Sequence, residues 1–123
     1  MKNEKIVIGL VGKMSSGKGT VAEYLEKNYG AVTYRFSTIL RDILNRVGQD
    51  ITRHNMQTLS TVMRENFGED LLAKVIAEDA RKDNHQIVIV DGVRRMADIK
   101  YLSPLLTGVI QKQGLDTDPT YPA

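Results

Sequence analysis

Residues 12–20 read Gly-Lys-Met-Ser-Ser-Gly-Lys-Gly-Thr and hold the residue types best suited to binding phosphate. Four residues separate Gly12 from Gly17, and Lys18 follows the second glycine directly. Glycines at this spacing let successive backbone N–H groups turn inward around phosphate oxygens, and the lysine after them reaches the terminal phosphates of a polyphosphate. We therefore predict a phosphate-binding loop, with a glycine-rich turn and an exposed lysine as the alternative. The predicted loop residues are Gly12, Lys13, Met14, Ser15, Ser16, Gly17, Lys18, Gly19 and Thr20.

The segments on either side of this loop favour the phosphate interpretation. Ile6 to Val11 is an apolar run rich in β-branched residues, which is typical of a strand covered on both faces. From Lys18 to Tyr29 apolar residues recur at helical spacing, and Gly30 provides a helix stop. In a strand, loop and helix arranged in this order, the helix points its positive N-terminus at the bound anion.

Two oxygen-bearing side chains are candidates for a magnesium ion at this loop. The strict motif has Ser or Thr directly after the lysine, whereas here Gly19 comes first and Thr20 follows. Asp91 comes directly after the apolar run Ile87 to Val90, and ligands of open parallel sheets bind at the carboxyl ends of strands. We predict that Thr20 and Asp91 serve the metal and that Lys18 and Asp91 are catalytic. An ordinary Asp-Gly turn is the alternative for Asp91.

The middle of the chain contains arginine in place of lysine. Between Asn28 and Ala73 every lysine or arginine is an arginine, and a guanidinium group binds phosphate bidentately. On one helix, Arg53, Gln57 and Arg64 lie within about 40° of one another and form a polar ridge. This ridge is a candidate substrate-binding surface, and a solvated helix face is the alternative.

Three stretches together resemble the nucleoside monophosphate kinases. The Gly-Lys-Gly-Thr sequence at 17–20 is similar to their phosphate-binding loop. Asp-Gly-Val-Arg at 91–94 resembles their Asp-Gly-x-x-Arg stretch, with one residue fewer. Ser-Thr-Ile-Leu-Arg at 37–41 is similar to the segment that begins their monophosphate-binding helices, shortened by two residues. The resemblance implies that Arg41 and Arg94 contact substrate phosphate, and that Ser37 either contacts substrate or only caps its helix.

The resemblance also implies an activity and its cofactors. Such kinases bind ATP with Mg2+ and transfer the γ-phosphoryl group to a nucleoside monophosphate or a related small phosphorylated acceptor, and the group includes dephospho-coenzyme A kinase. They catalyse transfer mainly by positioning and charge neutralisation. We therefore expect a nucleotide kinase whose partner is a small-molecule phosphate acceptor.

The order of the remaining segments predicts an α/β fold. Further strands are expected at 31–36 and 87–90, and helices at 37–48, 55–67, 71–80 and 95–102, with Ser37 or Thr38 as a helix cap. Strands that alternate with helices favour a parallel sheet. We expect a three-layer P-loop NTPase fold whose small sheet has three strands, or four if Val109 to Lys112 forms an edge strand.

Composition sets broad limits on location and partners. The chain has 123 residues, a net charge of +2 and no cysteine. This charge balance argues against nucleic acid as a partner, and no apolar run approaches the roughly 20 residues that cross a membrane. We expect a single cytoplasmic domain that binds neither nucleic acid nor membrane.

The C-terminal segment departs from the kinase pattern. We divide the chain into a kinase-like core at 1–102, with an acceptor-binding helical insertion at about 37–82, and an atypical, partly irregular tail at 103–123. No arginine follows Arg95, so the arginine-bearing lid of such kinases is not recognisable. The alternative function is therefore a catalytically weak or truncated nucleotide-binding module whose partner supplies the absent half. An uncovered sheet edge next to the first strand would favour a homodimer.

Overall fold

Four parallel strands form one sheet in the order β2-β3-β1-β4. The computed structural model describes residues 5–11 and 18–111 of the chain. The strands are β1 (Ile6–Val11), β2 (Val32–Arg35), β3 (Ile87–Val93) and β4 (Gly108–Gln111). β4 pairs with the edge of β1 that was expected to stay uncovered, so β1 is hydrogen-bonded on both sides.

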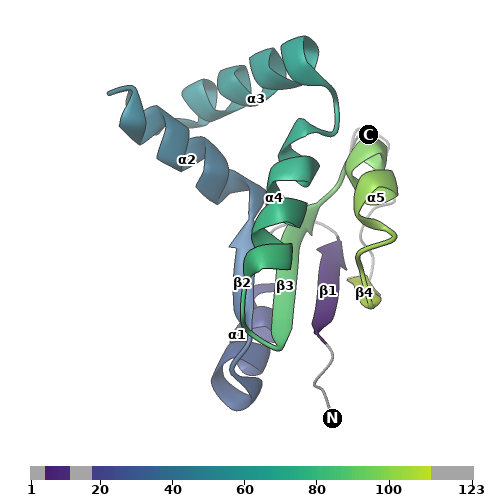
Figure 1. Cartoon of the computed structure of the whole chain (residues 1–123). Helices are drawn as coiled ribbons and strands as arrows, with labels where there is room; N and C mark the ends of the chain where they lie inside the picture. The colour runs from purple at the N-terminus through teal and green to yellow at the C-terminus, as the bar shows by residue number, and fades with distance from the viewer. Residues whose placement is uncertain (1–4, 12–17, 112–123) are drawn as a thin grey trace.

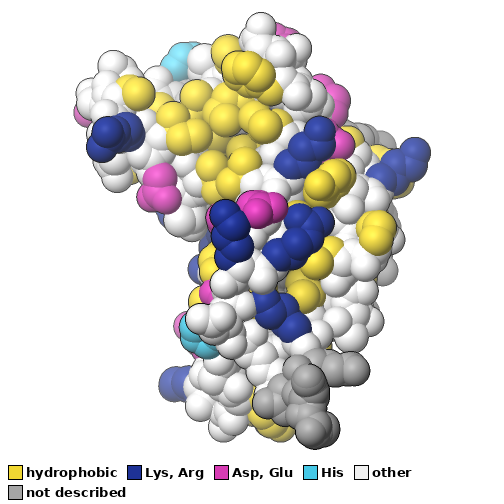
Figure 2. All heavy atoms as spheres, viewed as in Figure 1, with side chains coloured by type: hydrophobic (Ala, Val, Ile, Leu, Met, Phe, Trp, Pro, Cys, Tyr) yellow, Lys and Arg dark blue, Asp and Glu magenta, His cyan; other side chains and the backbone are white. Residues whose placement is uncertain are grey.

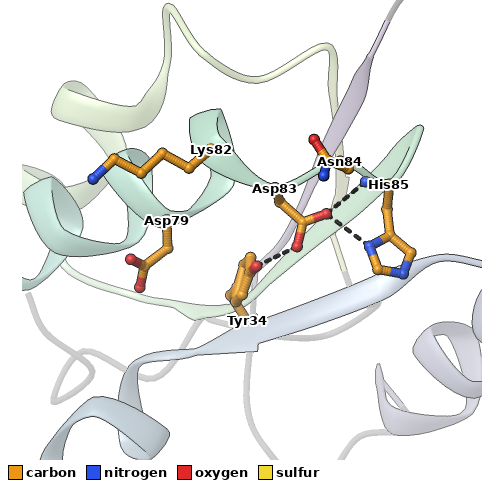
Figure 3. Close-up of a pocket in the computed structure, with 6 residues that line it drawn as sticks. All are labelled: Tyr34, Asp79, Lys82, Asp83, Asn84 and His85. Atoms are coloured by element: carbon orange, nitrogen blue, oxygen red, sulfur yellow. Dashed lines mark hydrogen bonds and ion pairs between the residues drawn. The ribbon is translucent and has the colours of Figure 1, made fainter.

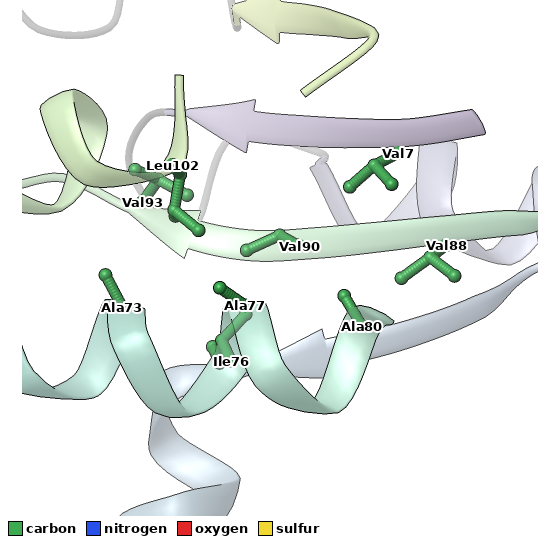
Figure 4. Close-up of a cluster of buried hydrophobic side chains, with 9 residues drawn as sticks. All are labelled: Val7, Ala73, Ile76, Ala77, Ala80, Val88, Val90, Val93 and Leu102. Atoms are coloured by element: carbon green, nitrogen blue, oxygen red, sulfur yellow. The ribbon is translucent and has the colours of Figure 1, made fainter. Parts of the chain in front are cut away.

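Helices cover both faces of this sheet and complete a three-layer α/β fold (Figure 1). α1 (Lys18–Tyr29) lies on one face, where Ala22 packs with Leu10 and Ile89. α4 (Leu71–Lys82) and α5 (Met96–Leu102) lie on the other face. The buried side chains of that second face are shown in Figure 4 and comprise Val7, Ala73, Ile76, Ala77, Ala80, Val88, Val90, Val93 and Leu102.

β3 continues past the residue where the apolar run stops. The strand was expected to end at Val90, but it includes Asp91 and Gly92 and ends at Val93. Gly92 has a φ of 91°, and the pairing register between β1 and β3 shifts at this point. Such a bulge changes which side chains share a face, which is why Val93 joins the same cluster as Val88 and Val90.

Two further helices extend beyond the carboxyl ends of the strands as a pair (Figure 1). They are α2 (Phe36–Arg46) and α3 (Arg53–Phe67), and we call them the helical pair. Figure 2 shows hydrophobic side chains gathered over this part of the molecule. Among the exposed apolar residues of the described chain, four belong to the helical pair or its connection: Val47, Ile51, Val62 and Phe67.

The helix starts differ from the expected caps. α2 begins at Phe36 with Arg35 as the preceding residue, and no side chain caps it by a hydrogen bond. Ser37 and Thr38 lie inside the first turn, so the prediction that one of them caps the helix is wrong. α3 begins at Arg53, two residues earlier than expected, because the Thr52 side chain accepts a hydrogen bond from the Asn55 backbone N–H.

The remaining predicted boundaries agree closely. α1 spans the expected residues, and β4 forms where an edge strand was considered. Residues 112–123, including the predicted irregular segment, lie outside the described residues. In the described ranges, 5–11 and 18–111, no helix has the length and apolar character needed to cross a membrane.

Candidate functional site

The carboxyl ends of three strands meet at one edge of the sheet. Asp91 of β3 is in register with Leu10 of β1 on one side and with Arg35 of β2 on the other. β1 ends at Val11 and α1 begins at Lys18, so the predicted loop starts and finishes at this same edge. Residues 12–17 of that loop lie outside the described residues, and Lys18, Gly19 and Thr20 form the first turn of α1.

Strand alternation assigns Asp91 to the same face as α1. Ile87 and Ile89 precede it at intervals of two residues, and both belong to the cluster that packs on α1. Asp91 is therefore oriented toward the layer in which α1 begins. The sequence pattern predicts that Asp91 lies near the carboxyl end of a strand, whereas its face depends on which residues of β3 contact which helix.

The Asp91 carboxylate is buried and paired with a cation. Its Oδ2 atom lies 3.3 Å from Nε of Arg35, whose side chain is 45% exposed, against 9% for Asp91. Arg35 was not among the predicted site residues. The sequence marks Arg35 only as one of the arginines between Asn28 and Ala73. Nothing in the sequence shows that β2 lies next to β3.

The donor set fits a magnesium ion. Mg2+ retains several waters and is usually bound through one or two carboxylates together with substrate phosphates. Among the described residues there is no group of three or more His, Cys, Asp or Glu that could hold a metal by itself. One strand-end carboxylate, Asp91, beside a phosphate-binding loop is consistent with that mode of binding, and the Thr20 hydroxyl is the other predicted oxygen donor.

The helical pair carries four of the predicted substrate residues, Ser37, Arg41, Arg53 and Arg64. Ser37 lies in the first turn of α2 and is partly buried, while Arg41 lies one turn later and is exposed. Arg53 is the first residue of α3 and is also exposed. Arg94 follows β3 directly and is exposed. Arg41, Arg53 and Arg94 are thus accessible to a ligand.

Arg64 has a different environment from the other arginines. Its side chain is only 6% exposed, and two of its nitrogens lie 3.3 and 3.2 Å from the carboxylate oxygens of Asp98, which is itself buried. It also donates to the Ser60 hydroxyl and to the Glu69 carbonyl. The expected ridge is therefore exposed at Arg53 and buried at Arg64, where the guanidinium is engaged by α5 and by the connection between α3 and α4.

Asp98 completes this buried pair from α5. Burial raises the pKa of its carboxyl, and the hydrogen bonds and charge of Arg64 oppose that rise. A second ion pair lies at the surface nearby, where Arg95, the residue before α5, lies 3.6 Å from Glu69 in the connection between α3 and α4. The end of α3 is thus attached to α5 by side chains of both charges.

A second group of polar residues lies on the opposite face of the sheet (Figure 3). The Tyr34 hydroxyl donates to Asp83, and Nδ1 of His85 lies 2.8 Å from the same carboxylate. Asp79, Lys82 and Asn84 complete the lining of a shallow depression of about 460 Å³. Asp83 and His85 precede β3, so this depression is next to its amino end, whereas Asp91 is near its carboxyl end.

Comparison with known proteins identifies the family. The model of an AAA domain family matches residues 11–117, which include the predicted loop, the helical pair and Asp91. The chain belongs to this AAA domain family. Together with the parallel sheet and its covering helices, the match establishes an α/β P-loop NTPase fold and supports nucleotide binding.

Three curated relatives of the chain come from archaea. A UPF0200 protein of Hyperthermus butylicus is 29% identical over 106 residues, which cover 86% of this chain and 56% of the relative. A UPF0200/UPF0201 protein of Archaeoglobus fulgidus is 31% identical over 99 residues, covering 79% of this chain and 30% of the relative. A UPF0200 protein of Thermococcus sibiricus is 30% identical over 97 residues, covering 77% and 50%. The chain thus spans about half the length of these relatives or less, and their names state no activity.

Proposed function

We propose that this AAA domain chain binds ATP with Mg2+ and transfers the γ-phosphoryl group to a nucleoside monophosphate or a related small phosphorylated acceptor. The observation that carries the proposal is the strand register, in which Asp91 lies between Leu10 of β1 and Arg35 of β2. The buried carboxylate therefore adjoins the strand that leads into the predicted phosphate-binding loop. The location is also where open parallel sheets bind their ligands.

In this proposal, the side chains act by positioning the bound phosphates and metal and by neutralising the phosphate charge. Lys18 and the loop amides neutralise the phosphates of ATP, while Asp91 and Thr20 hold the metal, which screens charge on the transferred group. Arg41, Ser37 and Arg94 hold the acceptor phosphate, and Arg53 is available at the start of α3. Arg64 supports the helical pair from within and does not touch the substrate.

A catalytically weak nucleotide-binding module is the second candidate. One observation favours it: residues 96–123 of the given sequence contain no arginine. Arginines that compensate charge in phosphoryl transfer contribute about 10³ to 10⁵ in rate. A chain without them would bind ATP and turn it over slowly.

Steady-state ATP consumption distinguishes the two candidates. We expect turnover that depends on an acceptor when the chain is supplied with Mg·ATP and a panel of nucleoside monophosphates and dephospho-coenzyme A. Tight ATP binding with no turnover on any acceptor would support the module instead.

The Lys18→Ala variant tests the loop itself. Loss of the charged hydrogen bonds from its ammonium group should weaken ATP binding about 10- to 100-fold, measured by calorimetric titration. Lys27→Ala, which removes a lysine from the last turn of the same helix, should bind ATP as the parent does. Equal ATP affinity in Lys18→Ala and the parent would contradict the proposed nucleotide site.

A further inference from the structure

Arg35 stands between the two halves of the proposed site. It is the last residue of β2 and directly precedes α2, the helix that carries Ser37 and Arg41. Its register partner in the sheet is Asp91, and its Nε atom lies 3.3 Å from Asp91 Oδ2. A single side chain thus connects the strand-end carboxylate with the start of the helical pair.

The environment of this ion pair is asymmetric. The Asp91 side chain is almost fully buried, whereas nearly half of the Arg35 side chain is open to solvent. A buried carboxylate is held in place by its surroundings, while a half-exposed arginine can change its direction at little cost. Arg35 is therefore the partner that can leave.

A magnesium ion and the Arg35 guanidinium group can each form an ion pair with Asp91. Both are cations, and both are stabilised by the negative charge of its buried carboxylate. Two cations close to one carboxylate also repel each other, and that repulsion is strongest where solvent is excluded. Binding of one should consequently weaken the hold of the other.

We propose that Arg35 competes with magnesium for Asp91 and so sets how strongly magnesium promotes nucleotide binding. This inference rests on the proposed function. Arg35 pairs with Asp91 when the metal is absent, and the metal displaces its guanidinium when Mg·ATP binds. The displaced group then remains beside the start of α2, where a guanidinium can bind a phosphate oxygen of the acceptor. Arg35 is in this sense a positioning residue that acts through Asp91.

The test is a ratio of equilibrium constants. The Kd for ATP is measured by calorimetry with excess EDTA and again with excess Mg2+, and the first value is divided by the second. In the Arg35→Gln variant we expect this ratio to rise by about two- to fivefold, the range for release of a partly exposed ion pair. Effects of the substitution on ATP that are equal in both conditions cancel in the ratio.

A matched control and a double variant separate this competition from a general loss of charge. Arg46→Gln removes the same charge from the last turn of α2 and should leave the ratio unchanged. In an Asp91→Asn background, the added Arg35→Gln substitution should no longer change the ratio, because the shared partner has lost its charge. Circular dichroism and the midpoint of urea unfolding verify that each variant is folded.

The possible outcomes distinguish a failure of the proposed competition from a failure of the proposed function. If the parent binds Mg·ATP and Arg35→Gln leaves its ratio unchanged, the competition is contradicted and the proposed function stands. A rise of the same size in the Asp91→Asn background also contradicts it, because Arg35 would then act on the nucleotide directly. A parent that binds no ATP in either condition contradicts the proposed function and this inference with it.

Discussion

Tyr34 illustrates how one side chain can join two elements. Its hydroxyl group, on β2, donates a hydrogen bond to Asp83, the residue that directly follows α4. This hydrogen bond, with burial as the next cause, raises the pKa of Tyr34 to about 12. Asp83 accepts a further hydrogen bond from the His85 backbone N–H, and despite the opposing effect of burial its pKa is lowered. The cluster thus prefers a protonated tyrosine next to an ionised aspartate.

This preference predicts a loss of folding stability at alkaline pH. Because the folded state binds the Tyr34 proton more tightly than the unfolded state, the contribution is complete below pH 10.0 and is lost as pH rises toward about 12. Urea unfolding across this range should show the advantage of the parent over Tyr34→Phe shrinking with pH. Tyr24→Phe, at an exposed tyrosine of α1, serves as the control. A parent advantage that is constant with pH would contradict the prediction.

The residues of the candidate site fall into two groups, those that a short sequence motif marks and those that no motif marks. Lys18 and Asp91 belong to short motifs whose spacing carries chemical meaning, so they were identified from neighbouring residues. Arg35 and Arg64 have no such motif. Their roles come from partners that are far away in the chain, and Arg64 lies 34 residues from Asp98.

Strand β3 is the element on which the geometry of the proposed site depends most. Its bulge lies directly after Asp91, and Gly92 has a positive φ that a side chain would strain. Among the described residues other than its chain neighbours, no atom lies within 4 Å of a Cβ added at Gly92, so the cost of a substitution there is conformational and not steric. The bulge also returns Val93 to the buried cluster of the α4 face.

Alanine at Gly92 should therefore destabilise the fold. We expect Gly92→Ala to lower the free energy of unfolding by about 1–2 kcal/mol, measured by urea denaturation. Gly108→Ala in β4 is the matched control, since no positive φ is present there and a Cβ would also meet open space. Its effect should stay within about 0.5 kcal/mol. Equal effects at the two glycines would show that the bulge does not require glycine.

At the scale of the whole molecule, the buried pair of Arg64 and Asp98 attaches the helical pair to the three-layer part of the fold. Arg64 lies in the last turn of α3, and Asp98 lies in α5, which packs with α4 over the sheet. The two carboxylate oxygens and two guanidinium nitrogens face each other, so the attachment has a defined direction. Candidate acceptor residues on the helical pair therefore keep a set relation to Asp91.

Breaking this pair from one side should cost more than removing both partners. Arg64→Met leaves the Asp98 carboxylate buried without its cation and should lower the free energy of unfolding by about 3–5 kcal/mol. The double variant Arg64→Met/Asp98→Leu should recover at least about half of that loss, as measured by urea denaturation. Arg46→Met, at an exposed arginine of α2, should be close to neutral. A double variant no more stable than the single one would mean that the uncompensated charge is not the source of the loss.

Sequence patterns alone were sufficient for the class of fold and most element positions, and they predict the chemistry of the loop. These features depend on residues within one or two turns of each other: the apolar run of β1, the helical spacing of α1, and the glycines and lysine at 12–18. Helix starts were less certain, because Thr52 is a local cap whereas α2 starts without one. The tail assignment at 112–123 stays a prediction.

Only the tertiary structure decided which charged groups meet. The order β2-β3-β1-β4 brings Arg35 next to Asp91, and the packing of α5 beside α3 and α4 buries Arg64 against Asp98. Neither pairing has a local signal, because an arginine has the same residue pattern around it whether it binds a ligand, a carboxylate or water. Its role is set by burial and by the charge opposite, and both arise when distant segments pack together.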